Sequence, residues 1–131
     1  MTAPTPAFQI ADASAAVKAL LGSSPLRLWP FGLAPQKGKP GYTVPYAVQQ
    51  VVYGTPQNTL SCPPDIDNFG VQFDVYAANA SAAWQIAYAL RDAYEGSYNQ
   101  VTAWNLEGVD EETGLYRVSF TVDFWPSRNQ S

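Results

Sequence analysis

The feature that most constrains the fold is a two-residue alternation of apolar and polar side chains near the end of the chain. Between Tyr116 and Phe124 every second residue is aromatic or aliphatic, and the residues between them are mostly polar. Successive side chains of a β-strand point to opposite faces, so this period predicts a strand with one buried face. Residues 69–77 repeat the pattern. Two such strands need a hydrophobic cover.

An amphipathic helix over residues 80–95 is predicted to supply that cover. Its apolar side chains recur at helical spacing and form one stripe, Ala83, Ile86, Ala87, Leu90 and Tyr94. Asn79 or Ser81 can cap the start of this helix, and Gly96 can end it. Trp84 falls nearer the other side.

The remaining segments are predicted from shorter signals. Residues 11–21 are Ala-rich and form a short helix, with Asp12 as its cap and Gly22 at its end. Further strands are expected over residues 42–53 and 100–107, with a short extended segment at 25–30. Residues rich in Pro, Gly or acidic side chains predict loops or turns at 32–41, 55–68 and 108–114.

This order of elements predicts an α+β fold, an antiparallel β-sheet with two α-helices packed on one face. The 131 residues are expected to form a single domain, 1–131, since this length suits one domain. A flexible N-terminal arm is expected over residues 1–10 and a flexible tail over 126–131.

The composition excludes several chemistries. The chain has no His, which excludes Ser-His-Asp and Cys-His triads and any His-ligated metal. A single cysteine, Cys62, excludes an internal disulfide. A net charge of -4 argues against a nucleic-acid-binding surface, which is basic. No apolar run reaches the roughly 18 residues of a membrane span, so no membrane partner is expected.

Two loop motifs lack residues that their chemistry needs. The run beginning at Asp65 starts like a calcium loop, but Phe69 and Ala77 stand where oxygen ligands are required. The segment around Gly38 and Lys39 lacks the spacing of a phosphate-binding loop. Both are interpreted as polar loops, and no metal or cofactor is expected.

The carboxylates could in principle form an acid–base pair. The candidates are Asp74, Glu107, Asp110, Glu111 and Glu112. Residues 110–112 fall in a predicted hairpin turn, where acidic side chains are common because they face water. No catalytic residue is therefore assigned, and the chain is not expected to be an enzyme.

Charged residues make up only 14% of the chain against about 25% in typical domains, and aromatic residues also make up 14%. This balance indicates that part of the surface is covered in use. Trp84 and Trp104 are expected in the core. Trp29 and Phe31 lie among Pro and Gly, and Trp125 falls on the outward side of its strand, so core and interface both remain open for these three.

Four short patterns, in order along most of the chain, resemble the tail-completion or tail-terminator proteins of long-tailed bacteriophages. They are LRLWP at 26–30 with APQ at 34–36, VPYAVQQ at 44–50 with Gly-Thr-Pro at 54–56, VQFDVYA at 71–77 with the following helix, and YRVSFTVDF at 116–124. Each pattern is strand and turn chemistry, and their order and spacing carry the resemblance. The loop at 37–42 is longer than in many relatives.

The resemblance implies an α+β structural protein with no enzymatic activity and no cofactor. It implies a homo-oligomeric ring, usually a hexamer, on the last ring of the tail tube protein. The ring stops tube polymerisation and offers a joining surface to the head-completion or connector protein. The expected location is the head-proximal end of the tail in the virion, after synthesis in the host cytoplasm.

Contacts with a neighbouring subunit or the tube are expected at the loop 54–68 and at the leftover aromatic residues. The residues expected at these contacts are Trp29, Phe31, Pro56, Asn58, Leu60, Asp65 and Trp125. DNA is expected to pass through the ring without specific binding, because Lys and Arg at phosphates supply most affinity for DNA. The alternative function is a small aromatic-rich module that binds a ligand or carbohydrate.

Overall fold

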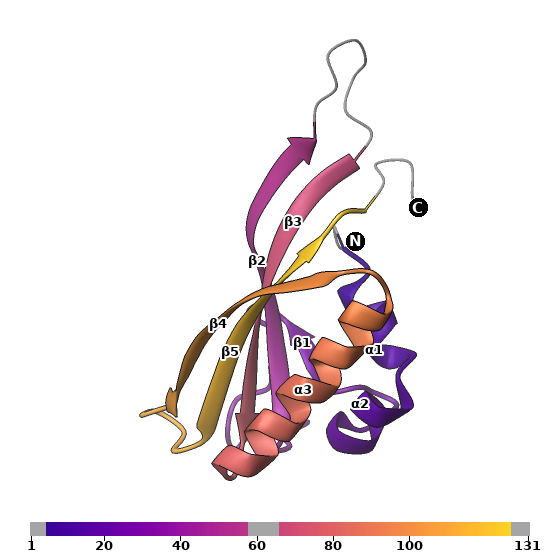
Figure 1. Cartoon of the computed structure of the whole chain (residues 1–131). Helices are drawn as coiled ribbons and strands as arrows, with labels where there is room; N and C mark the ends of the chain where they lie inside the picture. Colours follow the sequence, from indigo (N-terminus) through magenta and orange to yellow (C-terminus); the bar gives the residue numbers. More distant parts are fainter. Residues whose placement is uncertain (1–4, 58–65, 127–131) are drawn as a thin grey trace.

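The fold is a twisted five-stranded sheet covered on one face by three helices (Figure 1). This computed structural model describes residues 5–57 and 66–126, and side chains within them except at 55–57 and 66–67. The elements are α1 (Ala7–Asp12), α2 (Ala15–Leu21), β1 (Leu28–Pro30), β2 (Tyr46–Gln57), β3 (Ile66–Ala77), α3 (Ala80–Gly96), β4 (Gln100–Val109) and β5 (Tyr116–Phe124). The strand order is β1-β2-β3-β5-β4.

The core lies between the sheet and the helices. Phe73 of β3 stacks on Phe120 of β5 with ring centroids 5.3 Å apart, and both are fully buried. Tyr94 of α3 completes this aromatic cluster, 4.9 Å from Phe73. The two alternating strands predicted from sequence are therefore paired side by side, with their apolar faces under the helices.

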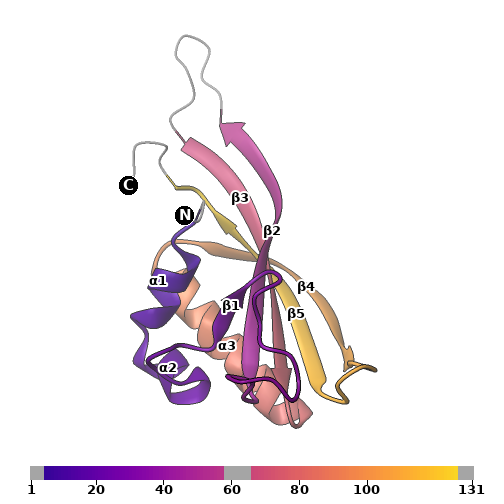
Figure 2. The same cartoon turned by 180° about the vertical axis from the view of Figure 1, so that it is seen from behind.

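The α+β class is confirmed, with two differences in detail. The sheet is mixed, because β1 runs parallel to β2, whereas an antiparallel sheet was expected. Residues 31–45 join these strands and are long enough for the crossover of about a dozen residues that a parallel pair needs. From behind, this connection is seen against the lower sheet (Figure 2).

The N-terminal region contains two helices where one helix, preceded by a flexible arm, was expected. Helix α1 begins at Ala7, so the arm expected over 1–10 is wrong for residues 7–10. Ala7 and Ala11 are buried, and the Tyr94 hydroxyl donates to the Ala7 carbonyl at 3.0 Å. The cap of α2 is Ser14, whose side chain accepts from the Val17 backbone at 3.3 Å, rather than Asp12.

Strands β2 and β3 are displaced from the predicted ranges. Strand β2 begins at Tyr46 and reaches Gln57, while β3 starts at Ile66, so the turn expected over 55–68 is partly strand. The far ends of both strands extend past the helices (Figure 1). We call residues 54–57 and 66–69 the projecting ribbon. Strand β4 also runs further than predicted, to Val109.

Helix α3 agrees closely with its prediction. It spans Ala80–Gly96, and the Asn79 side chain caps it by accepting from the Ala82 backbone at 2.8 Å. The predicted apolar stripe is the buried one, Ala83, Ile86, Ala87, Leu90 and Tyr94.

Candidate interaction surfaces

The base of the projecting ribbon is held by two aromatic rings that each cover a glycine on the paired strand. The ring of Tyr53 lies over Gly70, and the ring of Phe69 lies over Gly54, where an added Cβ would meet it at 2.8 Å. The Tyr53 hydroxyl donates to the Asp123 carboxylate of β5, and this bond raises the pKa of Tyr53. These contacts tie the ribbon to the sheet.

The predicted interface residues fall into two separate groups. Trp29 is half-buried on edge strand β1, and Phe31 follows this strand with 71% of its surface exposed. Trp125 is 42% exposed and follows Phe124, which pairs with Phe69 at the ribbon base. The structure thus places one group at the β1 edge of the sheet and the other at the base of the projecting ribbon.

Four predicted interface residues belong to the ribbon and its connection. Pro56 lies on β2 within the projecting ribbon, paired with Asp67, and its side chain lies outside the described residues. Asn58, Leu60 and Asp65 lie wholly outside them, together with Cys62.

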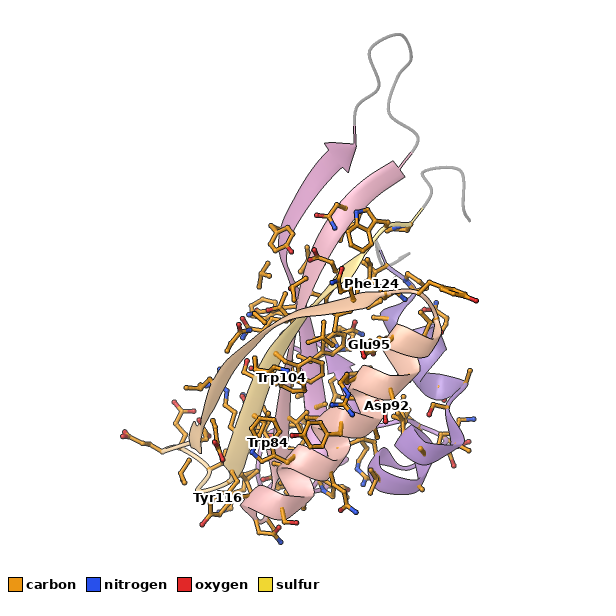
Figure 3. The ribbon with its side chains drawn as sticks, in the orientation of Figure 1. Trp84, Asp92, Glu95, Trp104, Tyr116 and Phe124 are labelled. Atoms are coloured by element: carbon orange, nitrogen blue, oxygen red, sulfur yellow. The ribbon has the colours of Figure 1, made fainter. Side chains whose placement is uncertain are left out.

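A third surface escaped the sequence prediction and lies between α3 and β4. Trp84 and Trp104 (Figure 3) have ring centroids 5.3 Å apart. Tyr88 packs edge-on against Trp104, with ring centroids 5.7 Å apart. Tyr88 is 44% exposed and Trp104 42%, so the expectation of a core position for Trp104 is wrong. We call Trp84, Tyr88 and Trp104 the aromatic edge. Arg91 lies 4.5 Å over the Tyr88 ring.

Helical spacing contained a signal for this surface. Trp84, Tyr88 and Arg91 recur at the intervals that place residues on one face of a helix, outside the apolar stripe of α3. A second aromatic stripe on a helix indicates a second contact surface.

An open apolar hollow of about 160 Å³ adjoins the aromatic edge. It lies between the start of α3 and the end of β4, and Trp84 donates through Nε1 to the Glu107 carboxylate at 3.0 Å beside it. The residues that line it are Ala80, Ala83, Trp84, Glu107, Gly108, Val109, Tyr116, Arg117 and Val118. Its wall is mostly hydrocarbon, which suits an apolar side chain.

Asp74 and Asp110, two of the candidate carboxylates, have structural partners. Asp74 on β3 accepts from Ser119 at 2.5 Å and pairs with Arg117 at 3.3 Å. Asp110 accepts from the Thr113 backbone at 3.1 Å and its hydroxyl at 2.6 Å, which shapes the β4–β5 turn. Within the described residues no group of three metal-ligating side chains is placed to hold an ion.

A groove of about 500 Å³ lies on the sheet face opposite the helices. Tyr46 and Tyr76 stack there with centroids 5.0 Å apart, and burial raises the pKa of Tyr46 to about 12. Lys37 from the β1–β2 connection and Asp110 from the β4–β5 turn also line it.

In the described part of the chain, no helix has the length and hydropathy to cross a membrane.

Comparison with known proteins shows the family to which the chain belongs. The model of the family described as tail completion protein gp17 matches residues 8–127. The chain therefore belongs to this family and is a structural protein of the phage tail. No curated protein matches it.

A solved structure has the same fold. The chain is similar to one from the "Virion of native gene transfer agent (GTA) particle", with a TM-score of 0.56 and 15% sequence identity. The match covers 92% of this chain and 91% of the other.

Proposed function

We propose that the chain forms a ring of six on the last ring of the tail tube, ends tube polymerisation and presents a joining surface to the head connector. It does so as a structural protein without catalysis or cofactor. The observation that carries this proposal is the match to the tail completion family over residues 8–127. Stopping a polymer requires a subunit that binds the tube end without offering a new tube end.

The exposed apolar side chains support an assembled state. Phe31 and Leu33 after β1 are 71% and 66% exposed, and Trp125 beside the ribbon base is 42% exposed. Exposed aromatic side chains are enriched at protein interfaces. We assign the β1 edge, with Trp29 and Phe31, to contacts between subunits. We assign the projecting ribbon, with Trp125 at its base, to contacts with the tube or the connector.

Deleting the gene and then complementing it tests this function. Without the chain, tails should be longer than normal and lack heads in electron micrographs. Trp29→Ala combined with Phe31→Ala should weaken assembly of the purified protein and tail attachment, whereas the matched change Tyr98→Asn should not. Unchanged mass, tail length and infectivity in the double variant would contradict this placement, and normal tails without the gene would contradict the function.

The ring should let DNA slide without binding it. Six subunits at a net charge of -4 each would carry -24. Three arginines have internal partners, because Arg27 donates to the Pro45 carbonyl at 2.8 Å, Arg91 pairs with Asp92 and Arg117 pairs with Asp74. Assembled protein should not retain DNA at low salt in a mobility-shift assay. A lumen lined by these arginines or Lys37 would contradict this expectation.

The tyrosine groove favours a second candidate, a module that binds a ligand or carbohydrate. Tyr76, which stacks on the buried Tyr46, lines the groove together with Lys37 and Asp110, whose side chains could hydrogen-bond a ligand. Thermal-shift screening with oligosaccharides tests it. A melting temperature that rises with a sugar in the native protein and not in Tyr76→Ala would favour the module.

A further inference from the structure

We propose that the apolar hollow beside the aromatic edge receives Phe31 of a second copy of this chain, so that the two opposite edges of the sheet meet in every subunit contact. This inference rests on the proposed ring and names the surfaces that close it. The two surfaces are the exposed end of β1, with Phe31 and Leu33, and the hollow between α3 and β4.

The hollow has the size and chemistry of a phenyl site. Its volume of about 160 Å³ is close to the roughly 150 Å³ of an apolar protein cavity that holds one benzene ring. Val109 and Tyr116 on its wall are 56% and 40% exposed in the single chain. An aromatic side chain inserted there would cover apolar surface on both partners.

Phe31 is the side chain that fits this requirement. It follows β1, it is 71% exposed, and its neighbour Leu33 is 66% exposed. Trp125 is less exposed, at 42%, and lies at the ribbon base rather than at a free edge of the sheet. Tyr98 is 96% exposed, but its hydroxyl suits the mostly apolar wall of the hollow less well than the hydrocarbon ring of Phe31.

Charge is complementary across the proposed contact. The connection from 31 to 45 contains Lys37 and Lys39 and no acidic residue, whereas β4 and its following turn contain four carboxylates and no basic residue. Lys37 shares the tyrosine groove with Asp110 and Glu112 within one subunit. Lys39 does not line that groove, so it can meet Glu107, the carboxylate on the wall of a neighbour's hollow, where Arg117 is already paired with Asp74.

Sheet topology makes this contact suitable for a ring. Strands β1 and β4 are the two edges of one sheet, so a contact between them joins different surfaces of the two copies. Such a heterologous contact repeats from copy to copy and closes into a ring when the rotation allows. The β4 edge carries irregularities after Val101 and after Trp104, which disfavour backbone pairing, so side chains carry this contact.

Complementation between two defective variants tests the pairing. Phe31→Asp removes the inserted ring, and Val109→Asp places a charge in the hollow; both positions are exposed, and circular dichroism checks the fold. Each variant alone should associate about thirtyfold more weakly, the loss typical of a central aromatic anchor. Mixed in equal amounts they should form heterodimers but no rings, because one intact Phe31 meets one intact hollow. Tyr98→Asn should assemble normally.

Crosslinking locates the contact on rings or on tails. Benzoylphenylalanine at position 31, irradiated in assembled material, should crosslink to residues 80–88 or 107–116 of a second copy. Crosslinks to the tube protein, to the connector or to another part of the chain would overturn this inference, as would a mixture of variants that forms no heterodimer. Absence of any ring, both free and on tails, would instead refute the proposed function.

Discussion

Strands β5 and β4 are paired neighbours, yet one is almost entirely covered and the other almost entirely exposed. From Val118 to Thr121 every residue of β5 is buried, whereas from Thr102 to Val109 every residue of β4 is exposed. Strand β5 lies between two strands and under α3, while β4 is a sheet edge. Pairing alone therefore does not bury a strand, and the uncovered one retains surface for a partner.

The largest effect is expected in the covered strand. Phe120→Ala removes a fully buried ring that stacks on Phe73, and it should lower the free energy of unfolding by about 3–5 kcal/mol. Urea denaturation measures this loss. A loss below about 1 kcal/mol would mean that the β3–β5 cluster is not the centre of the core.

Trp104→Ala, in the exposed strand, should lower the free energy of unfolding by a smaller amount, about 1–2 kcal/mol. Trp104 is 42% exposed, so its removal uncovers less surface, although its ring reaches Phe120 at 5.1 Å. Urea denaturation of the isolated protein compares the two variants directly. Equal losses would show that β4 is covered as fully as β5.

Gly70→Ala should lower the free energy of unfolding by about 1 kcal/mol, because the new Cβ displaces the Tyr53 ring and breaks its bond to Asp123. Gly108→Ala in β4 is the matched control, since a Cβ there meets nothing within 4 Å. Thermal unfolding of both variants tests the difference. A control that loses as much stability would show that Tyr53 does not hold the ribbon.

The smallest effect, absent at neutral pH, concerns Tyr46. Burial raises its pKa to about 12 in the folded chain, against about 10 when unfolded. The unfolded chain thus ionises first, so stability contributed by neutral Tyr46 is complete below pH 10 and is lost as the pH rises to 12. The melting temperature of Tyr46→Phe should fall less over this range. Parallel curves would contradict a buried Tyr46.

Several elements were predictable because local pattern and tertiary environment agree. The apolar stripe of α3 is the buried one, and the apolar residues of β5 from Val118 to Phe124 are buried as predicted. The expectation of a single buried face is wrong for the middle of β5, because Ser119 and Thr121 on its other face are also buried. Helix α1 was missed because a six-residue helix without a side-chain cap is marginal alone, and its order comes from packing and the Tyr94 bond.

The exposed position of Trp104 could not be predicted by parity. Register shifts leave Thr102 and Asn105 outside the regular pairing, so Val101, Trp104 and Glu107 share one face at intervals of three residues. Asn105 donates to the Thr121 hydroxyl at 2.7 Å beside one shift. A period of two applies only to a regular strand.

The amino-acid sequence by itself determined the α+β class, the covered strands and helix α3, because a periodic apolar face has few places to be buried. The resemblance of its motifs also indicated the tail completion family, which the family match confirmed. Only the tertiary structure decided which aromatic residues remain exposed. Exposure depends on which strands lie at the sheet edge and how far the helices reach, and neither is a local property of the chain.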